Sequence, residues 1–296
     1  MVDLTVVVLT KNEEKNIQKC IRSFRGIAKR YVVVDSFSED NTKQICFELK
    51  KYYNIDFYEH EFINHADQFN WALKNTDINT EWVMRIDADE ELTEELVNDI
   101  SDKLPNVKPN VNGIIVNRRI YFLGRWIKHG GLYPMKVLRI FRRNKAFCEQ
   151  KMMDEHIVLV EGEAIYFNSD IIDNNTKDLD WWINKHNWYS HREVIDYYHN
   201  KNAYLENSQI EQSLWKGQAE RKRWLKNNFY YKMPLFKRAK WYFLYRYFLR
   251  LGFLDGKEGL IYHFLQAYWY RFLVDAKIYE HEKKGTELAL MDSLKD

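Results

Sequence analysis

The stretch LTVVVLT at residues 4–10 decides the fold. It is a short, β-branched apolar run that ends at a polar residue, and apolar side chains follow it at helical spacing, at residues 17, 20, 21 and 24. Similar apolar runs recur at residues 31–34, 55–58 and 82–86, and segments with helical spacing separate them. This alternation predicts a mainly parallel sheet with helices on its faces.

The pattern changes in the rest of the chain. Strand-like runs at residues 113–116, 137–141 and 157–160 no longer alternate with helices, which predicts mixed sheet. From Asp178 onward the apolar residues have helical spacing, and aromatic residues are frequent. We therefore expect an α/β domain over residues 1–175 and a helical C-terminal region over residues 176–296.

The composition excludes several classes of protein. The chain has 296 residues, of which 46% are hydrophobic and only 11 are Gly and 4 are Pro, so it can bury a full core and is not of low complexity. Lys and Arg (45) nearly balance Asp and Glu (43), which argues against a nucleic-acid-binding protein. Three scattered cysteines, no signal-peptide pattern and no long apolar run together favour a cytoplasmic location.

The run RIDADEE at residues 85–91 contains the carboxylates best suited to chemistry. In an extended backbone Asp87 and Asp89 point to the same side. A cation between them would relieve their mutual repulsion, and oxygen ligands suit a divalent Mg or Mn ion. The alternative is an acidic helix start, which we assign to Glu94 and Glu95 but not to Asp89.

Polar residues end three of the predicted strands, at Thr10, Asp35 and Asp87. In an open parallel sheet, ligands bind beyond the carboxyl ends of the strands. Taken singly, each of these side chains fits a cap for the following helix, which is the commonest use of such residues. The acidic run at residues 85–91 is what favours a ligand site at this edge.

Several segments together resemble the nucleotide-binding half of family-two glycosyltransferases of the GT-A fold. They are LTVVVLTKNEE at residues 4–14, VVVDS at 32–36 with DNT at 40–42, Gln68 with Asn70 and Ala72, and DADE at 87–90. Residues 118–134, with GRW at 124–126 and HGG at 129–131, and LRIFR at 138–142 resemble the bacterial branch that elongates lipopolysaccharide core and related surface glycans. The resemblance covers roughly the first two thirds of the chain.

This resemblance implies that a sugar is transferred, with inversion, from a nucleoside diphosphate sugar. The metal would be held by Asp89, with Asp87 and His156 as further candidate ligands. It would neutralise the charge that develops on the diphosphate. For His156 an ordinary hydrogen-bonding role is the alternative.

The inverting reaction needs a carboxylate that takes the proton of the acceptor hydroxyl. Relatives often read Val-His-Glu where this chain reads MDEH at residues 153–156. Glu155 and Asp154 are therefore both candidate bases, and we prefer Glu155 because it occupies the glutamate position of the relatives.

The resemblance also implies which residues contact the two substrates. The residues expected to bind the donor are Thr10, Glu13, Asp35, Gln68, Asn70 and Asp87. Asp35 would face the base, Thr10 and Glu13 would line the base and ribose, and the two amides would lie near the diphosphate. The weaker candidates for the glycan or glycolipid acceptor are His129, Arg139 and Arg142.

The C-terminal region combines positive charge with aromatic residues. Between Lys216 and Arg250 there are eleven basic residues and one acidic residue, Glu220. Such a segment suits a helix that lies on an anionic membrane surface without spanning it, here the cytoplasmic face of the inner membrane. Nucleic acid is the other partner that such charge could bind, but no recognised motif accompanies it. A predicted helix over residues 180–193 is expected to pack its aromatic face on the catalytic domain.

Two other functions fit part of this pattern. A nucleotidyltransferase or sugar-phosphate enzyme would also use paired carboxylates on such a sheet, but it would have a basic glycine-rich loop where this chain has KNEE at residues 11–14. A non-catalytic glycan- or membrane-binding scaffold would have lost the carboxylates, whereas Asp87, Asp89 and Glu155 are all present.

Overall fold

The computed structural model describes residues 1–149, 155–203, 224–225 and 228–286, and the chain divides into two compact units. The first comprises Met1–Trp126 and Leu132–Thr176, and the second comprises Ile127–Gly131 and Lys177–Asp296. The sequence predicted a single boundary at residue 175, whereas the segment Ile127–Gly131 also belongs to the second unit. The amide of Gly130 in this segment donates a hydrogen bond to the carbonyl of Arg250 at 2.8 Å.

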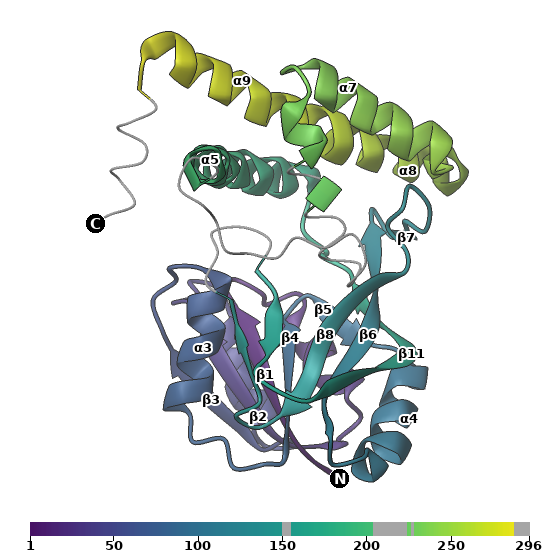
Figure 1. The fold of residues 1–296 in the computed structure, drawn as a ribbon. Coiled ribbons are helices and arrows are strands. Elements are labelled where there is room, and N and C mark those ends of the chain that lie inside the picture. The colour runs from purple at the N-terminus through teal and green to yellow at the C-terminus, as the bar shows by residue number, and fades with distance from the viewer. Residues whose placement is uncertain (150–154, 204–223, 226–227, 287–296) are drawn as a thin grey trace. The chain divides into compact units, whose positions relative to one another are not determined.

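The first unit is built on a mixed sheet with the strand order β3-β2-β1-β4-β8-β6-β11-β5, and β7 pairs with β6 (Figure 1). The parallel part consists of β1 (Val2–Thr10), β2 (Ala28–Asp35), β3 (Ile55–Glu59) and β4 (Trp82–Asp87). The mixed part consists of β5 (Glu90–Leu92), β6 (Val111–Phe122), β7 (Arg125–Trp126), β8 (Met135–Arg142) and β11 (Glu163–Asp173). A separate pair is formed by β9 (Ala146–Cys148) and β10 (Ile157–Leu159).

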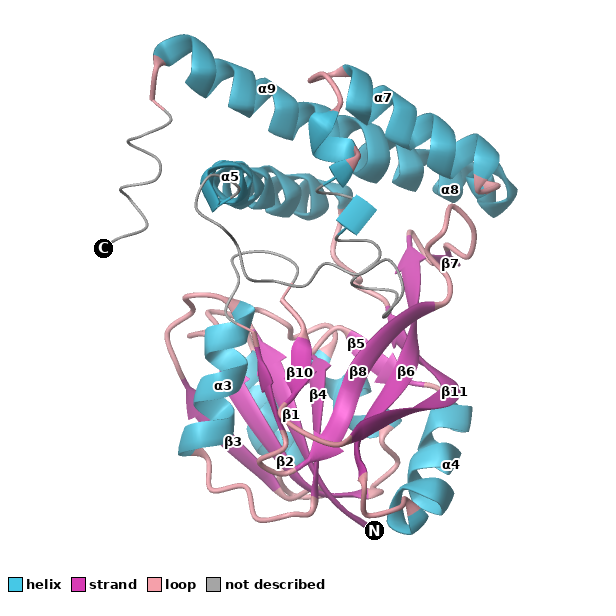
Figure 2. Cartoon of the chain, in the orientation of Figure 1, coloured by secondary structure: helices cyan, strands magenta, loops and turns pink. Residues whose placement is uncertain are grey.

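Helices cover this sheet, so the α/β fold predicted from the sequence is confirmed (Figure 2). They are α1 (Ile17–Ser23), α2 (Thr42–Leu49), α3 (His65–Asn75), α4 (Glu94–Lys103) and the 3₁₀ turn η1 (Leu104–Asn106). The side chain of Thr93 caps α4 by accepting from the amide of Leu96, which agrees with the predicted helix start at Glu94 and Glu95.

The packing of β1 explains why its sequence lacks polar alternation. Val6 and Val8 pack in one hydrophobic core with Ile17 of α1, whereas Val7 packs in another core with Phe69 of α3. Because successive side chains of a strand point to opposite faces, these cores lie on the two faces of the sheet. A strand that is buried on both faces reads as a continuous apolar run.

The second unit is helical, as the sequence predicted. Its elements are α5 (Leu179–Ala203), η2 (Tyr230–Lys232), α7 (Lys237–Leu244), η3 (Tyr245–Leu249), η4 (Gly252–Asp255), α8 (Gly256–His263), η5 (Phe264–Trp269) and α9 (Tyr270–Lys284). Val194 and Tyr198 of α5 pack with Val274 and Ile278 of α9.

The aromatic face of α5 packs on α9 within the helical unit. His186 stacks on Trp182 with ring centroids 3.5 Å apart and meets the edge of Tyr270, and Glu193 accepts a hydrogen bond from the Tyr270 hydroxyl at 2.6 Å. The expectation that this face also packs on the catalytic domain stays a prediction.

Among the residues whose structure is described, no helix is both long and apolar enough to cross a membrane.

Candidate active site at the carboxyl edge of the sheet

The strand register brings three of the predicted residues to one edge of the sheet. Thr10 at the end of β1 lies opposite Asp35 at the end of β2, and Leu9 lies opposite Asp87 at the end of β4. The three strands are parallel, so their carboxyl ends and the loops that follow them meet at this edge. The arrangement agrees with the expectation drawn from the strand-ending residues.

Two loops at this edge are tied together by hydrogen bonds. In the loop after β1, the amides of Asn12 and Glu13 donate to the hydroxyls of Ser38 and Thr42, at 2.7 and 2.8 Å, in the segment after β2. Asp35 in turn accepts from the amide of Ser38 at 2.7 Å. The loops are therefore held in place before any ligand binds.

Inside this loop pair, several polar groups are buried. Burial raises the pKa of Asp35, although two hydrogen bonds from Ser38 oppose the shift. The hydroxyl of Thr10 is buried, and it has no hydrogen-bond partner among the described residues. The carboxylate of Glu13 accepts from Asn16 at 2.7 Å. A buried hydroxyl beside a carboxylate is a group that a polar ligand could satisfy.

A cluster of arginines and carboxylates surrounds Asp87. Its carboxylate lies 3.4 Å from the guanidinium of Arg85 and 3.6 Å from that of Arg139. Burial would raise the pKa of Asp87, but these two guanidinium groups outweigh it and hold the pKa well below its usual range. Asp87 is therefore an anion whose charge is already compensated by the protein.

Glu90 is the buried carboxylate of the same cluster. It is completely buried, and its carboxylate lies 2.6 Å from Arg139 and 3.2 Å from Arg118 and accepts from the backbone amide of Asp87 at 3.0 Å. Neither Glu90 nor Arg85 was predicted as a site residue. Arg85 could have been identified from the sequence, because it is a charged residue within the otherwise apolar strand β4 and a buried charge needs a partner.

Asp89 has a different environment from Asp87. One of its carboxylate oxygens accepts from the side-chain amide of Asn175 at 2.8 Å, and its carbonyl accepts from the amide of Asn174 at 3.1 Å. The segment after β11 thus positions Asp89, which the sequence did not predict. Arg85, which lies close to Asp87, is not paired with Asp89, so Asp89 is the better of the two carboxylates for a cation.

Glu155 lies near the same cluster. Its carboxylate is 3.9 Å from the guanidinium of Arg85, and 15% of its side chain is exposed. The rival base Asp154 lies outside the described residues. The carbonyl of His156 accepts from the amide of Glu149 at 2.9 Å. In the described part of the chain no group of three acidic, histidine or cysteine side chains is placed to hold a metal ion together.

The two amides expected near the diphosphate are engaged elsewhere. Gln68 is buried and bonds to the hydroxyl of Ser36 at 3.0 Å and to the ring of His60 at 2.8 Å. Asn70 donates to the carbonyl of Cys148 at 2.7 Å and accepts from its amide at 2.9 Å. These bonds connect Gln68 to the loop after β2 and Asn70 to strand β9, and the expectation that the two amides contact the donor stays a prediction.

The two arginines among the acceptor candidates lie at different ends of the sheet. Arg142 pairs in register with Trp82, the first residue of β4, and forms an ion pair with Glu81, so it lies at the opposite end of that strand from Asp87. Arg139 belongs to the cluster around Asp87 and Glu90. His129 belongs to the helical unit, where its Nδ1 lies 2.6 Å from a carboxylate oxygen of Asp255.

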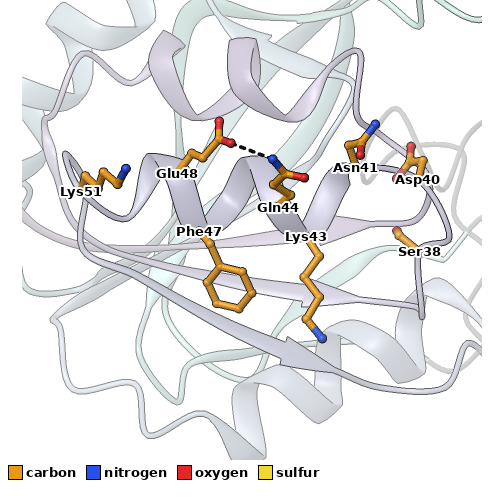
Figure 3. A pocket seen from close by; sticks show the side chains of 8 residues that line it. All are labelled: Ser38, Asp40, Asn41, Lys43, Gln44, Phe47, Glu48 and Lys51. Carbon is orange, nitrogen blue, oxygen red and sulfur yellow. Dashed lines mark hydrogen bonds between the residues drawn. The ribbon is translucent and has the colours of Figure 1, made fainter.

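A surface hollow lies elsewhere on the first unit. It has a volume of about 620 Å³ and runs along α2, where it is lined by Ser38, Asp40, Asn41, Lys43, Gln44, Phe47, Glu48 and Lys51 (Figure 3). Only its Ser38 end adjoins Asp35, through the bond described above. We place the site at the sheet edge, because the hollow brings together none of the carboxylates that the chemistry needs.

The burial of this cluster predicts a large stability effect. Arg139→Leu removes the guanidinium that lies 2.6 Å from the fully buried Glu90 and leaves that carboxylate only Arg118, at 3.2 Å, so we expect the free energy of unfolding to fall by about 3 kcal/mol. Urea unfolding measures it. The exposed neighbour Arg143→Leu should cost less than about 1 kcal/mol, and removing Glu90 as well should restore part of the loss. An Arg139→Leu protein as stable as Arg143→Leu would contradict the electrostatic role of the cluster.

The chain resembles curated glycosyltransferases over part of its length. An uncharacterized glycosyltransferase of Rickettsia bellii is 33% identical over 97 residues, which are 33% of this chain and 31% of that protein. Another from Rickettsia typhi is 33% identical over 100 residues, which are 34% and 32% of the two chains. The matched region thus spans about a third of the length of these relatives.

One comparison is with solved structures, to which the chain is similar at low sequence identity. The structure of S. aureus TarS 1-349 in complex with UDP-GlcNAc is similar over 96% of this chain and 92% of that chain, with 16% identity and a TM-score of 0.48.

The model of glycosyl transferase family 2 matches residues 5–170, more than half of the chain. Because this match runs from β1 into β11 and includes the strands that carry the carboxylate cluster, the chain belongs to glycosyl transferase family 2.

Proposed function

We propose that the protein is an inverting glycosyltransferase that moves a sugar from a nucleoside diphosphate sugar to a lipid-linked or lipopolysaccharide-type glycan of the bacterial surface. The observation that carries this proposal is the convergence of Thr10, Asp35, Asp87 and Asp89 at one edge of a family-two sheet. The membership of the family supports the reaction class. The acceptor rests on the resemblance of residues 118–142.

The donor would bind across the loops that follow β1, β2 and β4. In this proposal the carboxylate of Asp35 accepts hydrogen bonds from the base, and the buried hydroxyl of Thr10 meets the nucleoside. Asp87 would hold the ribose hydroxyls, because its negative charge is already compensated by Arg85 and Arg139. These arginines keep Asp87 ionised and fixed in place.

The residues at Asp89 fit a divalent cation of the Mg or Mn type. Such ions take one or two carboxylates of the protein and complete their coordination with substrate phosphates and water, so a closed cage of side chains is not required. Asn175 orients the Asp89 carboxylate at 2.8 Å and leaves its second oxygen without a protein donor among the described residues. When bound, the ion would supply positive charge for the leaving diphosphate.

Glu155 would act as the base. The proton of an acceptor hydroxyl moves to its carboxylate while the oxygen forms a bond to the anomeric carbon, and the bond to the diphosphate breaks with its electron pair on the departing nucleotide. Arg85, at 3.9 Å, favours the ionised form that a base needs.

The test of this function is donor hydrolysis and transfer by the purified protein across a panel of nucleotide sugars, with Mg or Mn present. We expect turnover of one donor well above the others. If every donor is inert but a sugar phosphate and a nucleoside triphosphate are joined, the protein is a nucleotidyltransferase. If neither reaction occurs and glycan or lipid is still bound, it is a scaffold.

A further inference from the structure

The helical unit exposes an apolar surface at the closed end of a helical hairpin. The helix α7 continues into η3, the chain turns, and α8 continues through η5 into α9 (Figure 1). Five large apolar side chains at this turn are exposed: Phe248, Leu249, Leu251, Phe253 and Leu254. The exposed fraction of Leu249 is 76%. We call these five residues the apolar turn.

The exposed apolar surface continues along both arms of the hairpin. Trp241 and Tyr245 are exposed on the first arm, and Leu260 and Phe264 are exposed on the second. Each pair is four residues apart, so its members are neighbours on the same helix face. Single exposed apolar residues are ordinary, but a contiguous group of this kind marks a surface that meets a protein or a membrane.

The exposed charges of the turn and of the first arm are positive. Arg250 and Lys257 are exposed beside the turn, Lys237 and Lys240 are exposed on the first arm, and Lys232 is exposed before that arm. Among the acidic residues, Asp255 is buried and bonds to His129, and Glu258 of α8 is half-buried. No ion pair joins these five basic residues to a carboxylate within the described part of the chain.

The structure also revises the basic segment that the sequence singled out at residues 216–250. Arg238 is buried and donates to Asp275 at 2.7 Å, and Arg246 is buried and donates to the carbonyl of Gly130 at 3.0 Å. These two arginines are structural and were wrongly counted toward a membrane surface. Residues 216–223 and 226–227 lie outside the described residues.

The backbone of Leu251 supplies an independent observation. Its φ is 60° and its ψ is 29°, in the left-handed region where glycine or asparagine is usual, and its side chain is 46% exposed. The folded protein therefore holds an exposed leucine in a strained conformation from which it gains little burial. Such an outlier points to a requirement outside the stability of the fold.

We propose that the apolar turn inserts into the headgroup region of an anionic phospholipid bilayer, with Arg250 and Lys257 beside it and the lysines of the first arm against lipid phosphates. Charge complementarity selects this occupant, because every exposed charged side chain of residues 228–257 is a cation. A lipid surface also matches a convex turn, which several apolar side chains can enter together. This docking is a property of the helical unit and does not depend on the proposed transfer reaction.

The test is sedimentation of the full chain with vesicles of phosphatidylcholine alone, or mixed equally with phosphatidylglycerol. We expect binding to the mixed vesicles that weakens with salt, and little binding to phosphatidylcholine. Leu249→Ser and Leu254→Ser should each weaken binding about ten-fold, since each removes a leucine from the apolar phase. Lys237→Gln and Lys240→Gln should each weaken it about five-fold, and only at low salt.

Leu251→Asn distinguishes an effect on vesicle binding from an effect on folding. Leu123→Asn is its matched control. Leu123 in the first unit is also an exposed leucine, with a φ of 49° and an exposed fraction of 55%. Asparagine at either position should keep or raise the thermal midpoint because it tolerates the left-handed region. Only Leu251→Asn should weaken vesicle binding.

Three results would overturn the proposal. The first is equal vesicle binding by wild type and Leu251→Asn. The second is an equal loss in Leu251→Asn and Leu123→Asn. The third is a wild-type dimer that Leu249→Ser converts to a monomer while vesicle binding is unchanged, because the apolar turn would then be an interface between two copies of the chain.

Discussion

The Glu155→Gln protein is expected to lose transfer by about 10³-fold in kcat while its affinity for the donor nucleotide changes little. The amide is nearly isosteric with the carboxylate but cannot accept the proton of the acceptor hydroxyl. Donor binding should persist, because the proposed role of Glu155 is toward the acceptor hydroxyl and not toward the donor. Single-turnover kinetics with the identified donor measure the loss, and calorimetry with the nucleoside diphosphate measures the affinity.

Glu161→Gln is the matched control for this variant. Glu161 is an exposed carboxylate a few residues further along the chain, and it pairs with Lys145. Its replacement should leave transfer within about two-fold of wild type. If Glu155→Gln turns over normally and Asp154→Asn is inactive, the base is Asp154. If both variants retain activity, the proposed acid-base step is wrong.

The second large effect is expected at Asp89. Asp89→Asn, or treatment of the wild-type protein with a chelator, should lower kcat/KM by roughly 10²–10³-fold, because the charge that the leaving diphosphate develops is then unopposed. Unlike Glu155→Gln, this change should also weaken binding of the nucleoside diphosphate. Added Mg or Mn should restore the chelated wild type but not Asp89→Asn.

Two further variants serve as comparisons for Asp89→Asn: Glu94→Gln as a neutral control, and Asp87→Asn as a change at the neighbouring carboxylate. Glu94 is an exposed carboxylate paired with Arg25, so its replacement should be neutral. Asp87→Asn should raise KM more than it lowers kcat, because Asp87 is compensated by two arginines and is proposed to hold the ribose. Full activity of the wild type in excess chelator would contradict the metal role outright.

Replacement of Asn175 should lower kcat/KM in the same way as Asp89→Asn but by a smaller factor, because its side-chain amide positions the Asp89 carboxylate. Its hydrogen bond to Asp89 comes from the segment after β11, and Thr176 in the same segment bonds to Asn16 at 2.7 Å. This segment therefore joins the loop after β1 to the acidic run. No local pattern in the sequence connects residues that are so far apart.

Much of the site could be predicted from the sequence because its signals are local. A strand that is buried on both faces can be recognised from its own apolar run, without knowledge of the neighbouring strands. A polar residue at its end marks the edge of the parallel sheet where ligands bind. For this reason Thr10, Asp35 and Asp87 are found together as expected. The expectation that Asp87 and Asp89 share one side of an extended backbone is wrong, because β4 ends at Asp87 and Asp89 lies in the turn before β5.

The roles of Gln68, Asn70 and Arg142 could not be read in the same way. An amide or a guanidinium is equally suited to a ligand and to a backbone carbonyl, so its role depends on what the fold places within about 3 Å of it. Asn70 is occupied by Cys148, which is distant in the chain, and the antiparallel pairing of β8 with β4 turns Arg142 to the end away from Asp87.

By itself the sequence determined the α/β architecture, the helical C-terminal region and the edge of the sheet where the carboxylates lie, because periodicity and strand ends are properties of adjacent residues. Only the tertiary structure decided which charges are compensated. It pairs Arg85 and Arg139 with Asp87 and buries Arg238 against Asp275, and it leaves Leu251 exposed next to the exposed Arg250. Charge compensation depends on distances between residues remote in the chain, and a linear pattern does not contain those distances.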